Sequence, residues 1–178
     1  TDYIVFTVDK TAARTGGNAV VGYIDPVTGL VKWSWHIWIV TDELFAKDQD
    51  YERMNGDQRL LFRMMDRNLG ANDPTGSGNR ARSCLYQWGR KDPFIGPNTY
   101  QGSEGSGASM YSGSGSRVYL KMTESSAETG TMEYAIRNPL VFITGVADTD
   151  NDWLWSGRSD GLWSADDNVA DKSVNDPC

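Results

Sequence analysis

Three aspartates at alternate positions, in the segment Asp148-Thr149-Asp150-Asn151-Asp152, come closest to a metal-ligand set in this sequence. Carboxylates at positions 1, 3 and 5 of a tight loop supply the hard oxygen ligands that calcium prefers. The rest of a helix–loop–helix calcium motif is missing, because Trp153 stands where that motif needs glycine and Ser159 where it needs a bidentate glutamate. Two readings follow. Calcium binds at Asp148, Asp150 and Asp152, or the segment is a solvated loop whose aspartates cap their own backbone, which the incomplete motif favours.

Tryptophans in polar surroundings form a second group of candidate functional residues. An exposed indole can stack on a sugar ring or anchor a protein partner, because it combines a large apolar face with a polar N–H. The same side chains can instead anchor long loops to a core, and this second use is the one that the sequence favours. The candidate ligand-binding residues are Trp38, Trp153, Trp155 and Trp163. Trp33 and Trp35 share an apolar strand face and are expected in the core.

No catalytic constellation stands out. His36 is the only histidine, so any Ser/His/Asp or Cys/His triad must use it. It lies between tryptophans in the middle of an expected strand, where a half-buried, hydrogen-bonded histidine is usual. The sequence has no GxxxxGK[ST] phosphate loop, and no pair of acids stands out as a glycosidase dyad. We therefore expect no catalytic residues and no enzymatic activity.

The two cysteines are Cys84 and Cys178. They show no CxxC or Cys/His spacing, which argues against a structural zinc site. Cys178 is the last residue of the sequence, and this favours a Cys84–Cys178 disulfide formed in an oxidising compartment. Two independent buried thiols are the alternative.

Charge and composition limit the class of partner. The net charge is −7, and residues 148–178 contain eight aspartates against Arg158 and Lys172. Because no basic excess exists, a nucleic-acid binder held by a basic face is excluded. The 19 glycines and the preference for aspartate over glutamate favour turns and loops over long helices. No apolar run reaches the roughly 18–20 residues of a membrane span, and no signal segment opens the sequence, as in a mature or trimmed product.

Hydrophobic periodicity indicates short strands, with little helix, that would position these residues. A turn at Asp25–Gly29 predicts a hairpin over 18–40. Residues 42–58 are expected as loop or short helix, and 102–116 as a Gly/Ser loop. Residues 59–69 are ambiguous, because the apolar residues 60, 61, 64 and 65 fit helical spacing but the segment is short. Residues 131–137 are expected as one or two helical turns that end at Asn138-Pro139. The expected strands are 3–8, 18–24, 30–40, 84–88, 117–122 and 140–143.

Several segments, taken in order, resemble a known group of proteins. They are GNAVV at 17–21, WSWHIW at 33–38, MDRNLGA at 65–71, LYQWGRKDPF at 85–94 and KSVNDPC at 172–178. Together they span nearly the whole chain. The sequence resembles secreted Bacteroidetes surface proteins related to the Fibrobacter succinogenes major paralogous domain, which often occur with fimbrillin-like modules.

The resemblance implies a mostly β (α+β) fold of C-type-lectin-like character, with antiparallel sheets, long loops and short helices. It implies one domain over 1–178, part of a longer surface protein. It also implies an extracellular location on the outer-membrane surface, as a secreted or lipoprotein-tethered chain. The expected function is a non-catalytic adhesin or fimbria-associated module that binds glycan or protein. The alternatives are a structural subunit of a surface assembly, with fimbrial subunits as partners, and, less favoured, a glycan-acting enzyme.

Overall fold

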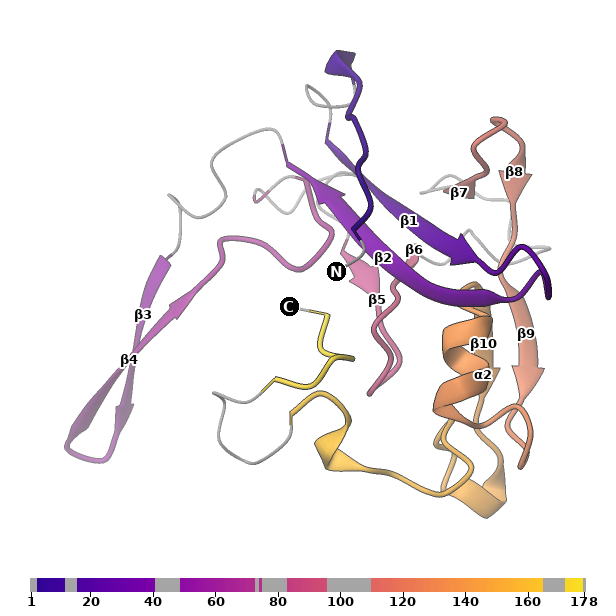
Figure 1. Cartoon of the computed structure of the whole chain (residues 1–178). Coiled ribbons are helices and arrows are strands. Elements are labelled where there is room, and N and C mark those ends of the chain that lie inside the picture. The colour runs from indigo at the N-terminus through magenta and orange to yellow at the C-terminus, as the bar shows by residue number, and fades with distance from the viewer. Residues whose placement is uncertain are drawn as a thin grey trace. The chain divides into compact units, whose positions relative to one another are not determined.

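The computed structural model describes residues 3–11, 16–40, 49–72, 74, 83–95, 110–164 and 172–177. Within them the chain is mostly β, with small two-stranded sheets and almost no helix (Figure 1), which confirms the predicted class. The chain divides into two compact units, which we call unit 1 (residues 1–19 and 38–83) and unit 2 (residues 20–37 and 84–178). Each is described by itself. A single domain over 1–178 stays a prediction.

The first two strands, β1 (Gly17–Ile24) and β2 (Val31–Ile39), form the predicted hairpin. Asp25 organises its turn, because its Oδ1 accepts the N–H groups of Val27 (2.8 Å) and Thr28 (3.0 Å). Gly29 takes a φ of 68°, a left-handed conformation that glycine adopts without the steric penalty of a Cβ. The turn chemistry read from the sequence is thus the chemistry that closes the hairpin.

The two faces of β2 differ from the prediction. Trp35, which we expected in the core, is 39% exposed, whereas Ser34 on the opposite face is only 2% exposed. The expectation for Trp35 is therefore wrong. The reason is that Ser34 Oγ donates to Asp92 Oδ1 at 2.7 Å, so a buried polar contact rather than an apolar row holds this strand.

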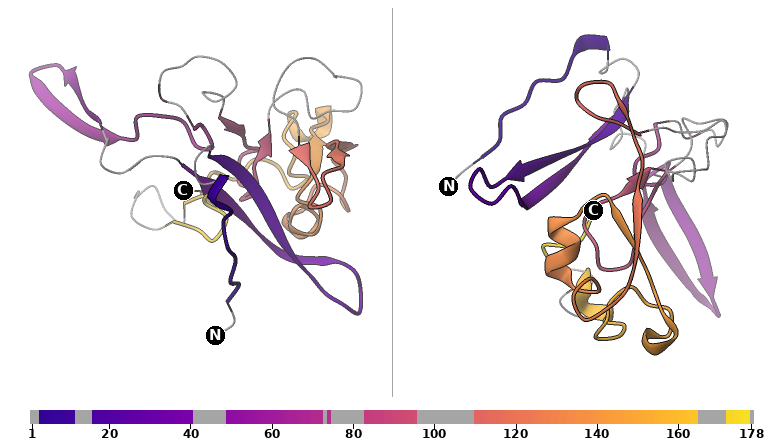
Figure 2. Two further views of the ribbon diagram at one scale, coloured as in Figure 1. Left: turned by 90° about the horizontal axis from the view of Figure 1, so that it is seen from above. Right: turned by 90° about the vertical axis from the view of Figure 1, so that its right-hand side faces the viewer.

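Unit 1 contains an antiparallel hairpin of β3 (Gln49–Asn55) and β4 (Gln58–Met64) (Figure 2). The prediction of loop or short helix is wrong over 49–55, and the ambiguous segment 59–69 is a strand as far as residue 64. Gly56, the first residue of the two-residue loop, has a φ of 62°. Glycine at that position is typical of type II′ hairpin turns, whose twist matches that of the flanking strands. Asn55-Gly56-Asp57 is therefore the turn that joins the two segments.

The strand predicted over 3–8 is also wrong. Residues 3–9 are irregular, and Tyr3 and Val5 are 84% and 80% exposed. Apolar residues lie on both faces of this segment, but no strand in the described part of the chain pairs with residues 3–9. A strand gains its stability from pairing and one-sided burial, and neither exists here.

The described residues of unit 2 form short sheets and one α-helix. Strand β5 (Cys84–Leu85) pairs with β6 (Phe94–Ile95), and β7 (Met110–Tyr111) pairs with β8 (Arg117–Val118), both antiparallel. Strand β9 (Lys121–Glu124) runs parallel to β10 (Val141–Thr144). Between them lies α2 (Met132–Arg137), followed later by two 3-10 turns, Ala147–Thr149 and Asp160–Leu162.

The position of α2 agrees with the predicted helical turns. Thr131 caps its first turn, because Thr131 Oγ1 accepts the N–H of Tyr134 at 3.1 Å. The helix ends at Asn138, before Pro139, as the proline requires. One face of α2 and strand β10 pack into the core of unit 2, whose buried residues are Ala135, Ile143, Trp153 and Leu154.

Candidate functional site

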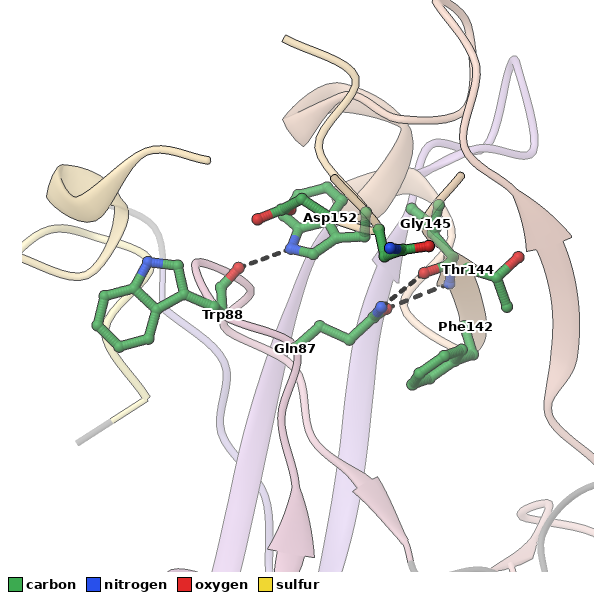
Figure 3. Close-up of a pocket in the computed structure, with 9 residues that line it drawn as sticks. Gln87, Trp88, Phe142, Thr144, Gly145 and Asp152 are labelled. Carbon is green, nitrogen blue, oxygen red and sulfur yellow. Dashed lines mark hydrogen bonds between the residues drawn. The ribbon is translucent and has the colours of Figure 1, made fainter. Parts of the chain in front are cut away.

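A groove in unit 2 is the candidate site. It has a volume of about 360 Å³ and lies where β10, the segment after it and the turn after β5 meet. Figure 3 shows the residues that line it. They are Gln87, Trp88, Phe142, Ile143, Thr144, Gly145, Asn151, Asp152 and Trp153.

The floor of the groove is fixed by the side-chain amide of Gln87. Its Nε2 donates to the carbonyl of Ile143 at 2.7 Å, and its Oε1 accepts the N–H of the same residue at 3.2 Å (Figure 3). The guanidinium of Arg90 donates to Gln87 Oε1 at 2.9 Å and so fixes which way the amide points. The amide oxygen and one N–H of the amide are used, so these contacts hold Gln87 in place and give the groove its shape.

Arg90 itself is buried, with an exposed fraction of 2%. Its Nη1 donates to the carbonyl of Val141 at 2.7 Å, and its Nη2 donates to that of Asn138 at 3.2 Å, at the end of α2. The guanidinium also lies over the rings of Phe94 and Trp153, at 4.9 and 5.9 Å from their centroids. Burial lowers the pKa of Arg90 to about 10, and nearby Asp92 opposes the shift, so the side chain stays charged at neutral pH.

A backbone close approach shapes the rim of the groove. A Cβ added at Gly145 would lie 2.0 Å from the carbonyl oxygen of Asn151, so only glycine fits there. Asp150 and Asn151 have φ values of 51° and 63°, a left-handed conformation that few non-glycine residues adopt. The N–H of Asn151 donates to the carbonyl of Val146 at 3.0 Å and holds this turn in place.

Polar groups at the rim remain available to a ligand. Asp152 Oδ1 accepts the N–H of Leu154 at 2.9 Å, which leaves its Oδ2 without a partner in the described part of the chain. The side-chain amide of Asn151, an exposed residue, has no hydrogen-bond partner among the described residues either. Thr144 Oγ1 donates to the carbonyl of Thr123 at 3.2 Å and retains acceptor capacity. The groove therefore presents an amide, a carboxylate oxygen and a hydroxyl.

An exposed aromatic surface adjoins the groove. The ring of Trp88 points away from Gln87 and Phe142 (Figure 3) and is 44% exposed. It packs on Trp163 with ring centroids 4.5 Å apart, and its Nε1 donates to the carbonyl of Ser159 at 3.0 Å. The indole N–H is occupied, so the ring can offer a ligand only its face.

The structure brings only some of the predicted binding residues to this place. Trp153 lines the groove but is 5% exposed, and its Nε1 donates to the carbonyl of Trp88 at 2.7 Å. Trp163 is partly buried, and its Nε1 donates to the carbonyl of Arg90 at 3.1 Å. Both act as loop anchors, the alternative that the sequence favoured. Trp155 is 40% exposed outside the groove lining, and Trp38 belongs to unit 1, where its buried Nε1 has no partner among the described residues.

The three aspartates proposed for calcium are not brought together as a ligand set. Asp148 and Asp150 are exposed, and Asp152 caps the backbone of Leu154. The described residues contain no group of three acidic, histidine or cysteine side chains that could hold a metal ion. Calcium binding here stays a prediction that the geometry does not support.

The cysteines are placed only in part. Cys84 is a free, buried thiol, and burial raises its pKa to about 11. Cys178 lies outside the described residues. The Cys84–Cys178 disulfide therefore stays a prediction.

A second polar cluster in unit 2 is buried. Lys91 Nζ contacts both carboxylate oxygens of Asp92, at 3.0 and 2.8 Å, and also Ser34 Oγ at 2.5 Å. Its ammonium lies 4.5 Å from the centroid of the Trp33 ring. Nearby, Nδ1 of His36 lies 3.3 Å from the Tyr86 hydroxyl. Ser34 and Asp92 are each 2% exposed, so this serine–lysine–aspartate contact ties β2 to residues 91–92 and has no access to a substrate.

Sequence reasoning missed most of the groove. Gln87 and Trp88 were read as part of a buried strand over 84–88, but the strand ends at Leu85. The one usable signal was Gly89, whose φ of 85° marks the turn that follows Trp88. Phe142 was expected only as a strand residue, Thr144 lay just beyond the predicted strand 140–143, and Asn151 was expected only as part of a calcium loop.

Comparison with known proteins adds no assignment. Among the described residues, no helix is long and apolar enough to cross a membrane. No protein-family model, no curated protein and no solved structure matches this chain.

Proposed function

We propose that unit 2 is a non-catalytic binding module that takes a hydroxyl-rich ligand, such as a saccharide unit, in the groove of residues 87–88, 142–145 and 151–153. The observation that carries this proposal is the pair of available polar groups, Asp152 Oδ2 and the Asn151 amide, in a groove that is also lined by Trp88, whose ring is 44% exposed. An amide and a carboxylate bind vicinal hydroxyls, and an indole face packs on the C–H surface of a sugar ring. A fixed floor favours such binding, because little conformational freedom is lost.

The resemblance to secreted surface proteins suggests where this binding module acts. The segments at 33–38 and 85–94 support a secreted chain on the outer-membrane surface, with a C-type-lectin-like fold. The mostly β architecture with long irregular segments is compatible with that finer fold. A protein loop presenting hydroxyl and amide groups is the other class of ligand that this rim could bind.

A binding assay with matched variants tests the proposal. A glycan array identifies a ligand, and calorimetry then compares wild type with Asp152→Asn. This variant keeps the Oδ1 acceptor that caps Leu154 but turns the available oxygen into an N–H donor. We expect about a tenfold to hundredfold loss of affinity, since a hydrogen bond to a charged group contributes about 1.5–3 kcal/mol.

Two further variants separate binding from folding. Asn151→Gly removes the amide while easing the left-handed backbone, so affinity should fall and stability should not. Asp148→Asn makes the same charge change as Asp152→Asn at an exposed position outside the groove lining, and it should leave affinity unchanged. Equal affinity of Asp152→Asn and wild type for every bound glycan would refute the groove as the site.

A second candidate function is favoured by a different observation. Every sheet in the described part of the chain has two strands, so backbone edges are left that another strand could extend. This supports a structural subunit of a surface assembly. Self-association of the purified chain, without glycan binding, would favour this second function over the first.

A further inference from the structure

The β3–β4 hairpin of unit 1 is exposed over residues 50–64. Every side chain in this range except that of Leu60, which is partly buried, is exposed to solvent. An isolated two-stranded hairpin is marginally stable in water, and a third strand or a covering surface is needed to stabilise it. In the described part of the chain no further strand pairs with β3 or β4. Both outer edges therefore carry backbone groups that can pair with another chain.

The register divides the side chains of this hairpin between two unlike faces. Residues directly opposite each other in an antiparallel pair share a face. Tyr51 lies opposite Phe62, and both are nearly half exposed, at 44% and 46%. Leu60 and Met64 are on the same side, which we call the aromatic face. The other side, the charged face, carries Asp50, Glu52, Met54, Arg59, Leu61 and Arg63.

Charge on the charged face is separated by strand. Both acids, Asp50 and Glu52, are on β3, and both bases, Arg59 and Arg63, are on β4. Within the hairpin they form two ion pairs. Arg59 pairs with Glu52, and Arg63 Nε lies 3.3 Å from Asp50 Oδ1. On the charged face, the β3 edge is thus acidic and the β4 edge is basic, while Arg53 of β3 lies on the aromatic face opposite Leu60.

We propose that copies of this chain associate head to tail through the hairpin, with β4 of one copy pairing with β3 of the next. A continuing antiparallel sheet requires the incoming β3 to run in the same direction as the resident β3. The register within the hairpin can therefore repeat between copies, with Arg63 opposite Asp50 of the second copy. The charged faces then alternate acidic and basic rows, and on the aromatic faces Phe62 of one copy lies opposite Tyr51 of the next.

The same charges argue against closed pairing through either edge. Joining two β3 edges would bring Asp50 and Glu52 close to their own counterparts, and joining two β4 edges would do the same for Arg59 and Arg63. Like charges opposite each other across a ladder are destabilising. Complementary edges that are not self-complementary generate open chains or rings rather than two-fold dimers. The inference rests on the second candidate function and deepens it by naming the partner as a second copy of this chain.

Sedimentation velocity of the full chain over a wide concentration range tests the proposal. We expect association that weakens as salt concentration rises, because the contacts across the ladder are exposed ion pairs. The double variant Asp50→Lys with Glu52→Lys makes both edges basic, and we expect association to weaken about tenfold or more. The double variant Glu128→Lys with Glu133→Lys makes the same charge change on exposed residues of unit 2 and should associate like wild type.

A four-residue charge exchange controls for the possibility that D50K/E52K weakens association by unfolding the hairpin. The variant D50R/E52R/R59E/R63D reverses both rows, so the two ion pairs within the hairpin can still form. It should associate with itself as wild type does. A labelled mixture with wild type should contain no mixed chains, because in each mixed contact two basic or two acidic edges meet.

Four outcomes overturn the inference: a wild-type chain that stays monomeric, D50K/E52K that associates unchanged, free mixing of wild type with the exchanged variant, or a closed dimer with no larger species. Association that is unaffected by D50K/E52K would refute the hairpin contact and leave a structural role through another surface standing. Glycan affinity of these variants is a separate readout, because the groove belongs to unit 2.

Discussion

Replacing Arg90 by methionine should be among the most damaging single changes in unit 2. Methionine fills a similar length but has no donors, so the carbonyl of Val141 loses its only partner in the described structure. A buried acceptor left unsatisfied costs about 1–3 kcal/mol. The carbonyl of Asn138 still accepts the N–H of Val141, and Gln87 Oε1 still accepts the N–H of Ile143. Losing Arg90 as a second donor at these two acceptors therefore costs less free energy. Loss of the cation–π contacts with Phe94 and Trp153 adds about 1 kcal/mol.

The expected loss is therefore about 2–4 kcal/mol of unfolding free energy, a large share of the roughly 5–15 kcal/mol available to a domain. Urea unfolding followed by tryptophan fluorescence measures it, and amide hydrogen exchange in β10 and α2 locates it. Arg137→Met is the matched control, because Arg137 is exposed and its ion pair is with Glu133, which is also exposed, a contact worth at most about 0.5 kcal/mol. A loss below about 1 kcal/mol in Arg90→Met would refute the reasoning, since one orphaned buried acceptor alone should exceed it.

Four further outcomes follow from the structure. Burial lowers the pKa of His36 below its usual 6.5, and Asp92 partly opposes the shift. The imidazole of His36 is therefore protonated at a higher pH in the unfolded chain than in the folded one. Unfolding free energy should therefore be greatest above pH 6.5 and fall as pH drops through that value, and His36→Gln should flatten this part of the profile; identical profiles would contradict it. The buried Cys84 thiol, with its pKa raised to about 11, should react slowly with alkylating reagents in the native protein and quickly in denaturant, as mass spectrometry can follow; fast native labelling would show that the site is open. Gly145→Ala should abolish ligand binding in the groove and lower the melting temperature, because the new methyl group meets the Asn151 carbonyl, whereas Gly113→Ala, with open space around it, should change neither. Excess calcium and excess chelator should give the same melting temperature, because the described residues contain no gathered ligand set; a rise with calcium would restore the metal reading of 148–152.

Local signals in the sequence were sufficient for part of the fold. The turn at Asp25–Gly29 and the stop at Asn138-Pro139 are encoded by neighbouring residues, so the first hairpin and α2 could be predicted. The second hairpin was missed because Leu60, Leu61 and Met64 fit a helical spacing, and the glycine turn at 56 was not weighed against it. Trp35 was misplaced because hydrophobicity alone chose the buried face, while a hydrogen bond from Ser34 to Asp92, far along the chain, decided it.

The candidate site could be predicted far less well. Its floor depends on a glutamine amide meeting the backbone of a strand more than fifty residues away. Such a contact leaves no periodic trace in the sequence. The aspartate spacing at 148–152 pointed to a segment that does form part of the groove rim. It suggested metal ligation, however, which needs three convergent carboxylates. In the structure only Asp152 faces the groove, and one of its two oxygens already caps a backbone N–H.

The contacts that Gln87 and Arg90 make with β10 also determine whether a further strand can pair with the outer edge of β10. The carbonyls of Leu140 and Thr144 accept hydrogen bonds from Lys121 and Ser125, so the backbone groups of residues 141 and 143 point to the opposite edge. That edge is occupied, because Gln87 and Arg90 bond to it as a neighbouring strand would. An incoming strand would have to displace a buried, charged side chain to pair there. Gln87 and Arg90 thus block strand pairing at this edge of the β9–β10 sheet, whereas no described strand occupies either outer edge of the β3–β4 hairpin.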